Sequence, residues 1–260
     1  GQYDGALADY ATAIKLSPPF HEAHYNRADM LRELGDMDAA LADLDYAAVL
    51  DPNHVDTLVN RADLLLERGD AERARADIEA GLELDPANAN LLTAKGSLLA
   101  DSGDTDGAHA SYAAALASDP GFAAAWANRA VLLFAAGNLT EAVNDLDRAI
   151  ALGDDPALRA NRAIALADLG EHGRAIADLD LAVGAFNGEA PDLLYRRGAS
   201  RYALGDTEGA LADWQAHLAA YGSGGTSPYA EEIRRLAADL QNGHGLLAQL
   251  YPAEIPENVT

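Results

Sequence analysis

Residues 35–52 read GDMDAALADLDYAAVLDP, residues 69–86 read GDAERARADIEAGLELDP, and residues 103–120 read GDTDGAHASYAAALASDP. The three stretches share a leading glycine, small and apolar residues at helical spacing, and a closing proline, and their glycines stand 34 residues apart. A fixed period of this length indicates a stack of similar helical units, none of which buries its apolar face alone. The sequence therefore predicts an all-α solenoid.

Each repeat is expected to hold two antiparallel helices joined by a glycine turn. Upstream of each glycine, apolar and small residues return at helical spacing, as in Leu58, Ala62 and Leu65. Small residues on the first helix face an alanine on the second, which lets the two helices approach closely. Glycine takes a positive φ to end the first helix, the acidic or amide residue after it favours the next helix start, and proline stops the second helix.

This set of in-phase residues resembles the tetratricopeptide repeat family. The resemblance covers about residues 1–221, with a second-helix half unit at 1–20 and six full units at 21–54, 55–88, 89–122, 123–155, 156–190 and 191–221. It implies a right-handed superhelix of antiparallel helix pairs. Arg201 and His217 stand where the family has Leu and Ala, which predicts a less tightly packed last unit.

Both ends of the stack depart from the repeat. Residues 222–227 are rich in glycine and serine and predict a flexible loop. A capping helix is expected at 228–242, with Ser227 as its N-cap and Pro228 at its first position, and the tail 243–260 is expected to pack against it. The half unit at 1–20 lacks a covering helix, so self-association through it is one expectation.

Charge and composition limit the classes of partner. The formal net charge is −24, so nucleic-acid backbones and anionic membrane surfaces would be repelled, and a partner with a basic segment is favoured. An alternative is that the acidity only keeps the protein soluble. No apolar run is long enough to predict a membrane span. The chain has no cysteine, which fits a reducing compartment and predicts a cytoplasmic location.

Catalytic and metal-binding patterns are missing from the sequence. The run His21-Glu22-Ala23-His24 is one residue too short to place two imidazoles one helical turn apart around a zinc ion. The other histidines are scattered, and no glycine-rich phosphate loop follows a predicted strand. We therefore predict that the chain is not an enzyme and that it binds no cofactor or metal.

The family resemblance implies a binding surface. In the family, first helices line a concave groove and the sixth repeat position points into it; here that position holds Asn26, Asn60, Asn128, Asn161 and, in the last unit, Arg196. Such a row resembles the asparagine ladder in the repeat domain of O-linked N-acetylglucosamine transferases. A carboxamide offers a donor and an acceptor, and can therefore hold a peptide backbone of any sequence. The alternative is that these residues only hydrate the helix surface.

The remaining groove positions change in character along the chain. Asp29, Glu33, Asp63 and Glu67 make the first half acidic, whereas Val131 and Ile164 belong to a later half of small and apolar residues. This pattern predicts a basic peptide segment toward the N-terminal units and an apolar one toward the C-terminal units. Charged helix faces are, however, also common where a helix is merely solvated.

A second row of residues predicts ion pairs within the units. Position seven carries a cation and one position of the second helix carries a carboxylate, as in Arg27 with Asp43. The unit with Lys95 in place of Arg also has Ser111 in place of Asp. This joint change indicates a structural pair.

Together these features predict a non-catalytic scaffold that binds a protein or peptide in its groove. The alternative is a substrate-recruiting or regulatory region of a larger enzyme, such as a glycosyltransferase, whose catalytic domain lies outside this sequence.

Overall fold

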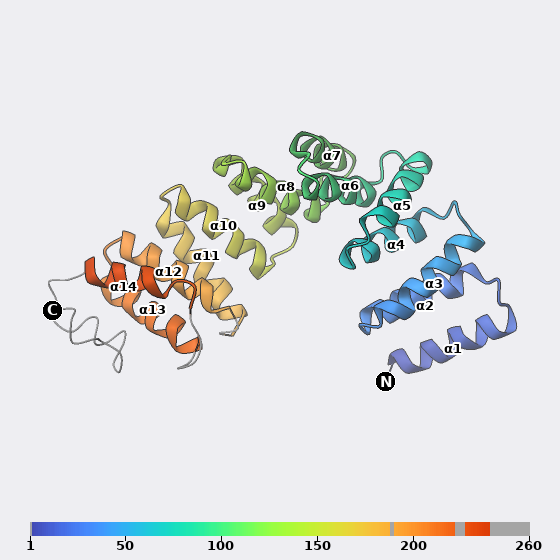
Figure 1. The fold of residues 1–260 in the computed structure, drawn as a ribbon, viewed down its shortest axis with the longest axis horizontal. Coiled ribbons are helices and arrows are strands. Elements are labelled where there is room, and N and C mark those ends of the chain that lie inside the picture. Colours follow the sequence, from blue (N-terminus) through green and yellow to red (C-terminus); the bar gives the residue numbers. More distant parts are fainter. Residues whose placement is uncertain (1, 188–189, 222–226, 240–260) are drawn as a thin grey trace. The chain divides into compact units, whose positions relative to one another are not determined.

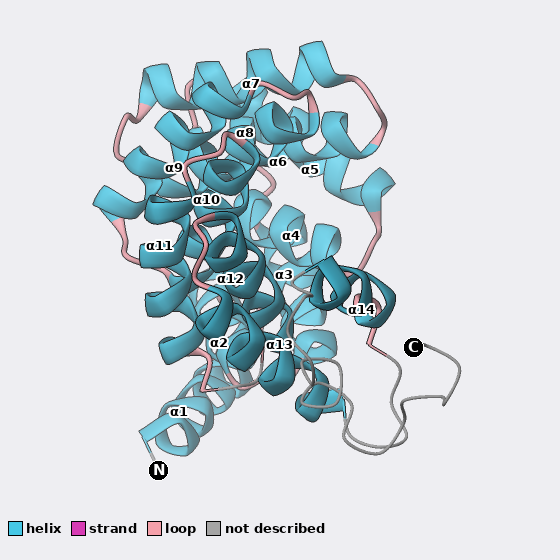
Figure 2. Cartoon of the chain, turned by 90° about the vertical axis from the view of Figure 1, so that its left-hand side faces the viewer, coloured by secondary structure: helices cyan, strands magenta, loops and turns pink. Residues whose placement is uncertain are grey.

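The computed structural model describes residues 2–187, 190–221 and 227–239, and within these ranges every regular element is an α-helix (Figures 1 and 2). The first helices of the repeats are α2 (His21–Glu33), α4 (Val55–Glu67), α6 (Ala89–Asp101), α8 (Ala123–Ala135), α10 (Pro156–Asp168) and α12 (Pro191–Ala203). The second helices are α1 (Gln2–Leu16), α3 (Met37–Leu50), α5 (Ala71–Leu84), α7 (Thr105–Ser118), α9 (Leu139–Leu152), α11 (His172–Ala185) and α13 (Thr207–Tyr221), followed by α14 (Ala230–Asp239). The predicted all-α solenoid class is confirmed.

The chain divides into two compact units, residues 1–132 and 133–260. In the first unit, α2 packs on α3, α4 on α5 and α6 on α7; in the second, α10 packs on α11 and α12 on α13. The first helices begin at the residues where the sequence places the unit starts. No helix in the described ranges combines the length and apolar character that crossing a membrane requires.

Each glycine turn has the backbone that the sequence predicts. Gly35 has a φ of 81°, and the N–H of Asp36 donates to the carbonyl of Leu31 at 2.9 Å, which closes α2. The side chain of Asp36 then accepts from the N–H of Ala39 at 3.1 Å and caps α3. Equivalent caps form at Asp70, Asp104 and Asp206. Asn138 and Glu171 make no such side-chain bond, so the turn does not depend on the cap.

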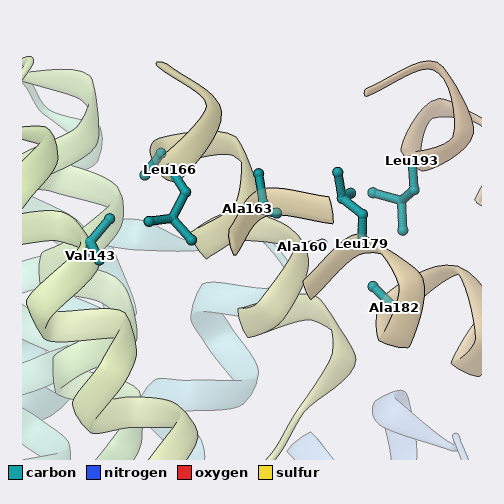
Figure 3. Packing of buried hydrophobic residues seen from close by; sticks show 9 residues of the cluster. Val143, Ala160, Ala163, Leu166, Leu179, Ala182 and Leu193 are labelled. Atoms are coloured by element: carbon teal, nitrogen blue, oxygen red, sulfur yellow. The ribbon is translucent and has the colours of Figure 1, made fainter. Parts of the chain in front are cut away.

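Small residues set the distance between paired helices. A Cβ on Gly96 would lie 2.5 Å from Cε1 of Tyr112, so α6 and α7 can approach this closely only because the side chain is absent. Figure 3 shows one core cluster of the second unit, in which Leu166 and Leu179 pack around Ala163. Ala163 is fully buried. Packing of this kind supplies the apolar burial that each repeat alone lacks.

The expectation of a less tightly packed last unit is wrong. Trp214 and His217 are both fully buried. His217 Nδ1 lies 2.9 Å from the carbonyl oxygen of Pro191, and its Nε2 lies 2.6 Å from Ser227 Oγ. Arg201 Nη1 donates to Asp213 at 2.9 Å. Both polar side chains have hydrogen-bond partners inside the protein, and these bonds offset the cost of burying His217 and of partly burying Arg201.

The C-terminal helix starts later than the sequence suggests. It begins at Ala230 rather than Pro228, because Ser227 Oγ accepts from the backbone N–H of Tyr229 at 3.1 Å and holds 227–229 as a turn. Ile233 of α14 is fully buried in a cluster with Tyr195 and Trp214, so α14 covers part of the terminal repeat. The expected end of this helix at 240–242, the loop 222–226 and the tail 243–260 lie outside the described residues.

Candidate functional site

The predicted groove residues of the first unit lie on first helices. We call them the first-helix surface: Asn26, Asp29, Glu33, Asn60, Asp63, Glu67, Asn128 and Val131. The three asparagines are half-buried. At the equivalent place in the third repeat, Ala94 is buried and offers no polar group.

Two of the asparagines bond to the preceding first helix. Asn60 Nδ2 donates to Tyr25 Oη at 3.2 Å, and Asn128 Nδ2 donates to Ser97 Oγ at 3.3 Å. Each bond uses one of the two N–H groups of the carboxamide and leaves its carbonyl oxygen uncommitted by that bond. The bonds therefore orient the two carboxamides without consuming their capacity to hold a peptide unit.

Carboxylates surround these amides on α2 and α4. Asp29, Glu33 and Glu67 are exposed and Asp63 is half-buried. Burial raises the pKa of Asp63, Arg32 opposes the rise and Glu67 adds to it. The pKa of Tyr25 is also raised, by burial first and then by the charges of Asp56 and Asp29. Besides burial, the negative charges of Glu67, Asp56 and Asp29 contribute to these two shifts, and a bound cation would offset those charges.

Sequence reasoning missed an aromatic cluster beside this surface. His21 Nε2 and His54 Nδ1 lie 3.0 and 2.9 Å from Thr57 Oγ1, and the two imidazole rings are 4.4 Å apart. Tyr25 packs edge-on against His54 at 5.2 Å. The sequence analysis treats His21 only as part of the run His21–His24 and His54 as one of the scattered histidines. Both stand at the edge of a repeat unit, and that shared register was the available signal. The cluster packs around Tyr25, whose hydroxyl oxygen accepts the hydrogen bond from Asn60.

The residue at repeat position seven forms the predicted ion pair in four of the five repeats that lie wholly within one unit, and the exception is the repeat 89–122 with Lys95 and Ser111. Arg27 Nε and Nη2 donate to Asp43 Oδ2 and Oδ1 at 2.6 and 2.7 Å, and the same two-point contact joins Arg61 to Asp77, Arg162 to Asp178 and Arg197 to Asp213. The hydrogen bonds to Asp77 raise the pKa of Arg61, so its guanidinium stays protonated. The carboxylates are buried, which assigns the pairs to the fold rather than to ligand binding.

A second carboxylate, unforeseen from the sequence, extends the pairing between repeats. The remaining guanidinium nitrogen of Arg61 donates to Asp45 of the preceding repeat at 3.2 Å. Arg162 and Arg197 reach Asp147 and Asp180 in the same way, at 2.6 and 2.8 Å. Each arginine thus links the second helix of its own repeat to that of the repeat before it.

The second unit carries the other predicted residues. Asn161 is exposed on α10, and Ile164 and Arg196 are half-buried on α10 and α12. In the first unit, Val131 of α8 is 56% exposed, a high value for an aliphatic side chain. Within the described ranges, no three His, Asp or Glu side chains come together in a way that could hold a metal ion.

The chain is similar in fold to several solved structures. A chain of the anaphase-promoting-complex hetero-tetramer Cut9–Hcn1 superimposes with a TM-score of 0.76 at 13% identity over 91% of this chain, which spans 46% of that longer chain. PilF of Pseudomonas aeruginosa gives 0.71 at 16% identity, covering 90% of this chain and 99% of its own. A tetratricopeptide repeat protein of Parabacteroides merdae gives 0.61 at 23% identity, covering 91% and 92%.

A search among curated proteins finds none that matches this chain. A sequence model described as tetratricopeptide repeat matches residues 1–55, 59–108 and 93–158, more than half of the chain. These matched segments contain the glycine turns at Gly35, Gly69, Gly103 and Gly137. The chain therefore belongs to the tetratricopeptide repeat family.

Proposed function

We propose that the chain is a non-catalytic protein-binding scaffold whose first-helix surface holds an extended basic segment of a partner. The observation that carries this proposal is the pairing of two features on α2 and α4. Half-buried carboxamides at Asn26 and Asn60 can bond a peptide backbone, and the carboxylates beside them favour cationic side chains. The raised pKa of Asp63 supports it, since a cation would stabilise the ionised carboxyl.

The second unit has a surface of its own with a different character. Asn161 supplies a carboxamide, and the half-buried Ile164 lies one turn further along α10. We propose that this surface takes an apolar stretch of a partner, with Arg196 of α12 as its polar neighbour. Protein binding is the general role of the family. The polar and apolar character of the two surfaces is the basis on which we propose the kind of segment that each binds.

The test for the first unit uses a fluorescein-labelled peptide of alternating Lys and Ser, titrated with the full chain. Asp63→Asn/Glu67→Gln is expected to weaken binding by about tenfold, because it removes two carboxylates from the surface. Glu72→Gln/Glu79→Gln is the matched control, since it makes the same change in net charge at exposed sites on α5. Equal losses in both variants would show unspecific attraction by net charge and overturn the proposed site.

A second pair of variants tests the amides. Asn26→Ala/Asn60→Ala should weaken binding of the same peptide while leaving its dependence on salt concentration unchanged, because no charge is removed. Melting temperatures are compared with the wild type to separate binding from stability. Unchanged affinity in a variant that folds normally would remove the carboxamides from the site.

A further inference from the structure

Exposed carboxylates form a row across the first helices of the first unit. Position thirteen of the repeat holds Glu33 on α2, Glu67 on α4 and Asp101 on α6, and all three residues are exposed. None of the three makes a hydrogen bond or an ion pair with another residue in the part of the chain that the structure describes. An exposed carboxylate on a second helix can behave differently, since Asp38 of α3 pairs with Arg68. The row therefore adds no such contact to the fold.

The first helices α2 and α4 lie side by side in register. His21 begins α2 and His54 caps α4, and their rings are 4.4 Å apart; further along, Asn60 donates to Tyr25 at 3.2 Å. In both contacts the two partners stand within one repeat position of each other, so equivalent positions of the two helices are neighbours. The helix α4 also packs against α6. Packed helices lie about 8–10 Å apart, and the row thus presents one carboxylate per repeat at about this spacing.

This spacing limits the conformation of a bound segment. A polyproline II helix advances about 3.1 Å per residue with three residues per turn, so side chains three residues apart share one face at a spacing of about 9 Å. A β-strand returns to the same face after two residues, or about 7 Å. An α-helix does so after seven residues, or about 10 Å, but its backbone groups are bonded internally and cannot bond to Asn26 and Asn60. Of the three, polyproline II alone matches the spacing and leaves its backbone free for the carboxamides.

The amides and the carboxylate row share one face of each helix. Positions six and thirteen are seven residues apart, which is close to two full turns and about 10 Å along the axis. From a backbone held at the amides, the long side chain of lysine or arginine extends toward the carboxylate across this distance.

We propose that the segment bound by the first-helix surface is a polyproline II helix with lysine or arginine at every third position, one for each of Glu33, Glu67 and Asp101. This inference rests on the function proposed above. It names the conformation and the spacing of the basic segment, and it adds Asp101 of α6 to the site.

Two labelled peptides of equal composition test the spacing. One consists of four repeats of Lys-Pro-Ser and the other of two repeats of Lys-Ser-Lys-Pro-Pro-Ser, and each is titrated with the full chain. Both hold the same number of lysines, prolines and serines, but only the first has its lysines three residues apart. The first peptide should bind the wild type about tenfold more tightly, because it alone places a lysine opposite each carboxylate.

Variants of the chain test whether the row reads this spacing. In Glu33→Gln/Glu67→Gln/Asp101→Asn, the two peptides should bind within about twofold of each other, because the row has lost its charge. The matched control, Glu72→Gln/Glu79→Gln/Glu83→Gln, makes the same change in net charge at exposed sites on α5 and should keep the preference. Melting temperatures of both variants are compared with that of the wild type.

A proline-free peptide, four repeats of Lys-Ala-Ser, tests the conformation. It should bind more weakly than the Lys-Pro-Ser peptide, because proline pre-sets the extended backbone and lowers the entropy lost on binding. Tighter binding of the proline-free peptide would overturn the polyproline II conformation.

The outcomes also separate this inference from the function on which it rests. If the two peptides of equal composition bind the wild type equally well, and Asp63→Asn/Glu67→Gln still weakens both, the basic-segment function stands and the spacing is wrong. A preference that survives in the variant of the row would likewise overturn the spacing. If neither peptide binds, the inference and the proposed function are both wrong.

Discussion

The second repeat (55–88) and the third repeat (89–122) are neighbours whose antiparallel helix pairs are joined by different polar contacts. In the second, Arg61 donates two hydrogen bonds to the buried Asp77 and a third to Asp45 of the first repeat. In the third, Lys95 is exposed and Ser111 Oγ donates to the carbonyl of Gly107 in its own helix at 2.9 Å. The antiparallel pair forms in both. The ion pair is thus not what brings two helices together; it satisfies a buried carboxylate and ties one repeat to the previous one.

Loss of the Arg61–Asp77 ion pair in the second repeat should lower the free energy of unfolding more than any other change considered. Arg61→Ala leaves Asp77 buried without its cation and should lower the free energy of unfolding by about 2–4 kcal/mol, somewhat less than for a fully buried pair because Arg61 is partly exposed. Lys95→Ala, the counterpart in the third repeat, should change it by less than about 0.5 kcal/mol. Urea unfolding of both variants measures the difference. Similar losses would contradict the distinction between the repeats.

Glycine rather than charge should be critical in the third repeat. Gly96→Ala places a methyl group 2.5 Å from Tyr112 Cε1 and should cost about 1–3 kcal/mol of unfolding free energy. Tyr112→Leu in the same chain should recover part of the loss, since three other repeats pair alanine with an aliphatic residue. Thermal unfolding of the single and double variants tests this coupling. Additive losses would show that the aromatic–glycine contact does not set the packing.

The outer carboxylate should matter less than the buried one. Asp45→Asn removes a partner of Arg61 that is 41% exposed, and the expected loss is below about 1 kcal/mol, declining further as salt is raised. The comparison is made by urea unfolding at low and high salt. A loss as large as that of Arg61→Ala, or one that salt leaves unchanged, would place the main contribution in the contact between repeats.

A pH effect on binding is the smallest of these expectations. The pKa of Asp63 is raised, so lowering the pH protonates it earlier than an ordinary carboxyl. A cationic peptide favours the ionised form, so its affinity should be constant while Asp63 is ionised and should fall as the pH is lowered through the pKa of Asp63. In Asp63→Asn the upper part of this fall should vanish, as read by peptide titration across pH. An unchanged profile would show that Asp63 does not face the peptide.

The repeat period predicts most of the fold because each glycine, small residue and proline acts locally on its own helix pair. Gly35 and Asp36 illustrate this, since turn and cap follow from neighbouring residues. His217 shows where local reasoning ends: its two partners, Pro191 and Ser227, lie in other elements, and only the folded chain reveals that its burial is satisfied. The same holds for Asp45 and for the His21–His54 cluster, whose partners come from adjacent repeats.

The central claim is that the first-helix surface of the first unit holds a basic peptide through its amides. The most direct measurement follows the side-chain amide resonances of Asn26 and Asn60 by nuclear magnetic resonance while the peptide of alternating Lys and Ser is added. We predict saturable shifts of both resonances, with little change in residues of α5. Shifts confined to second helices, with both asparagine resonances unmoved at saturation, would contradict the account.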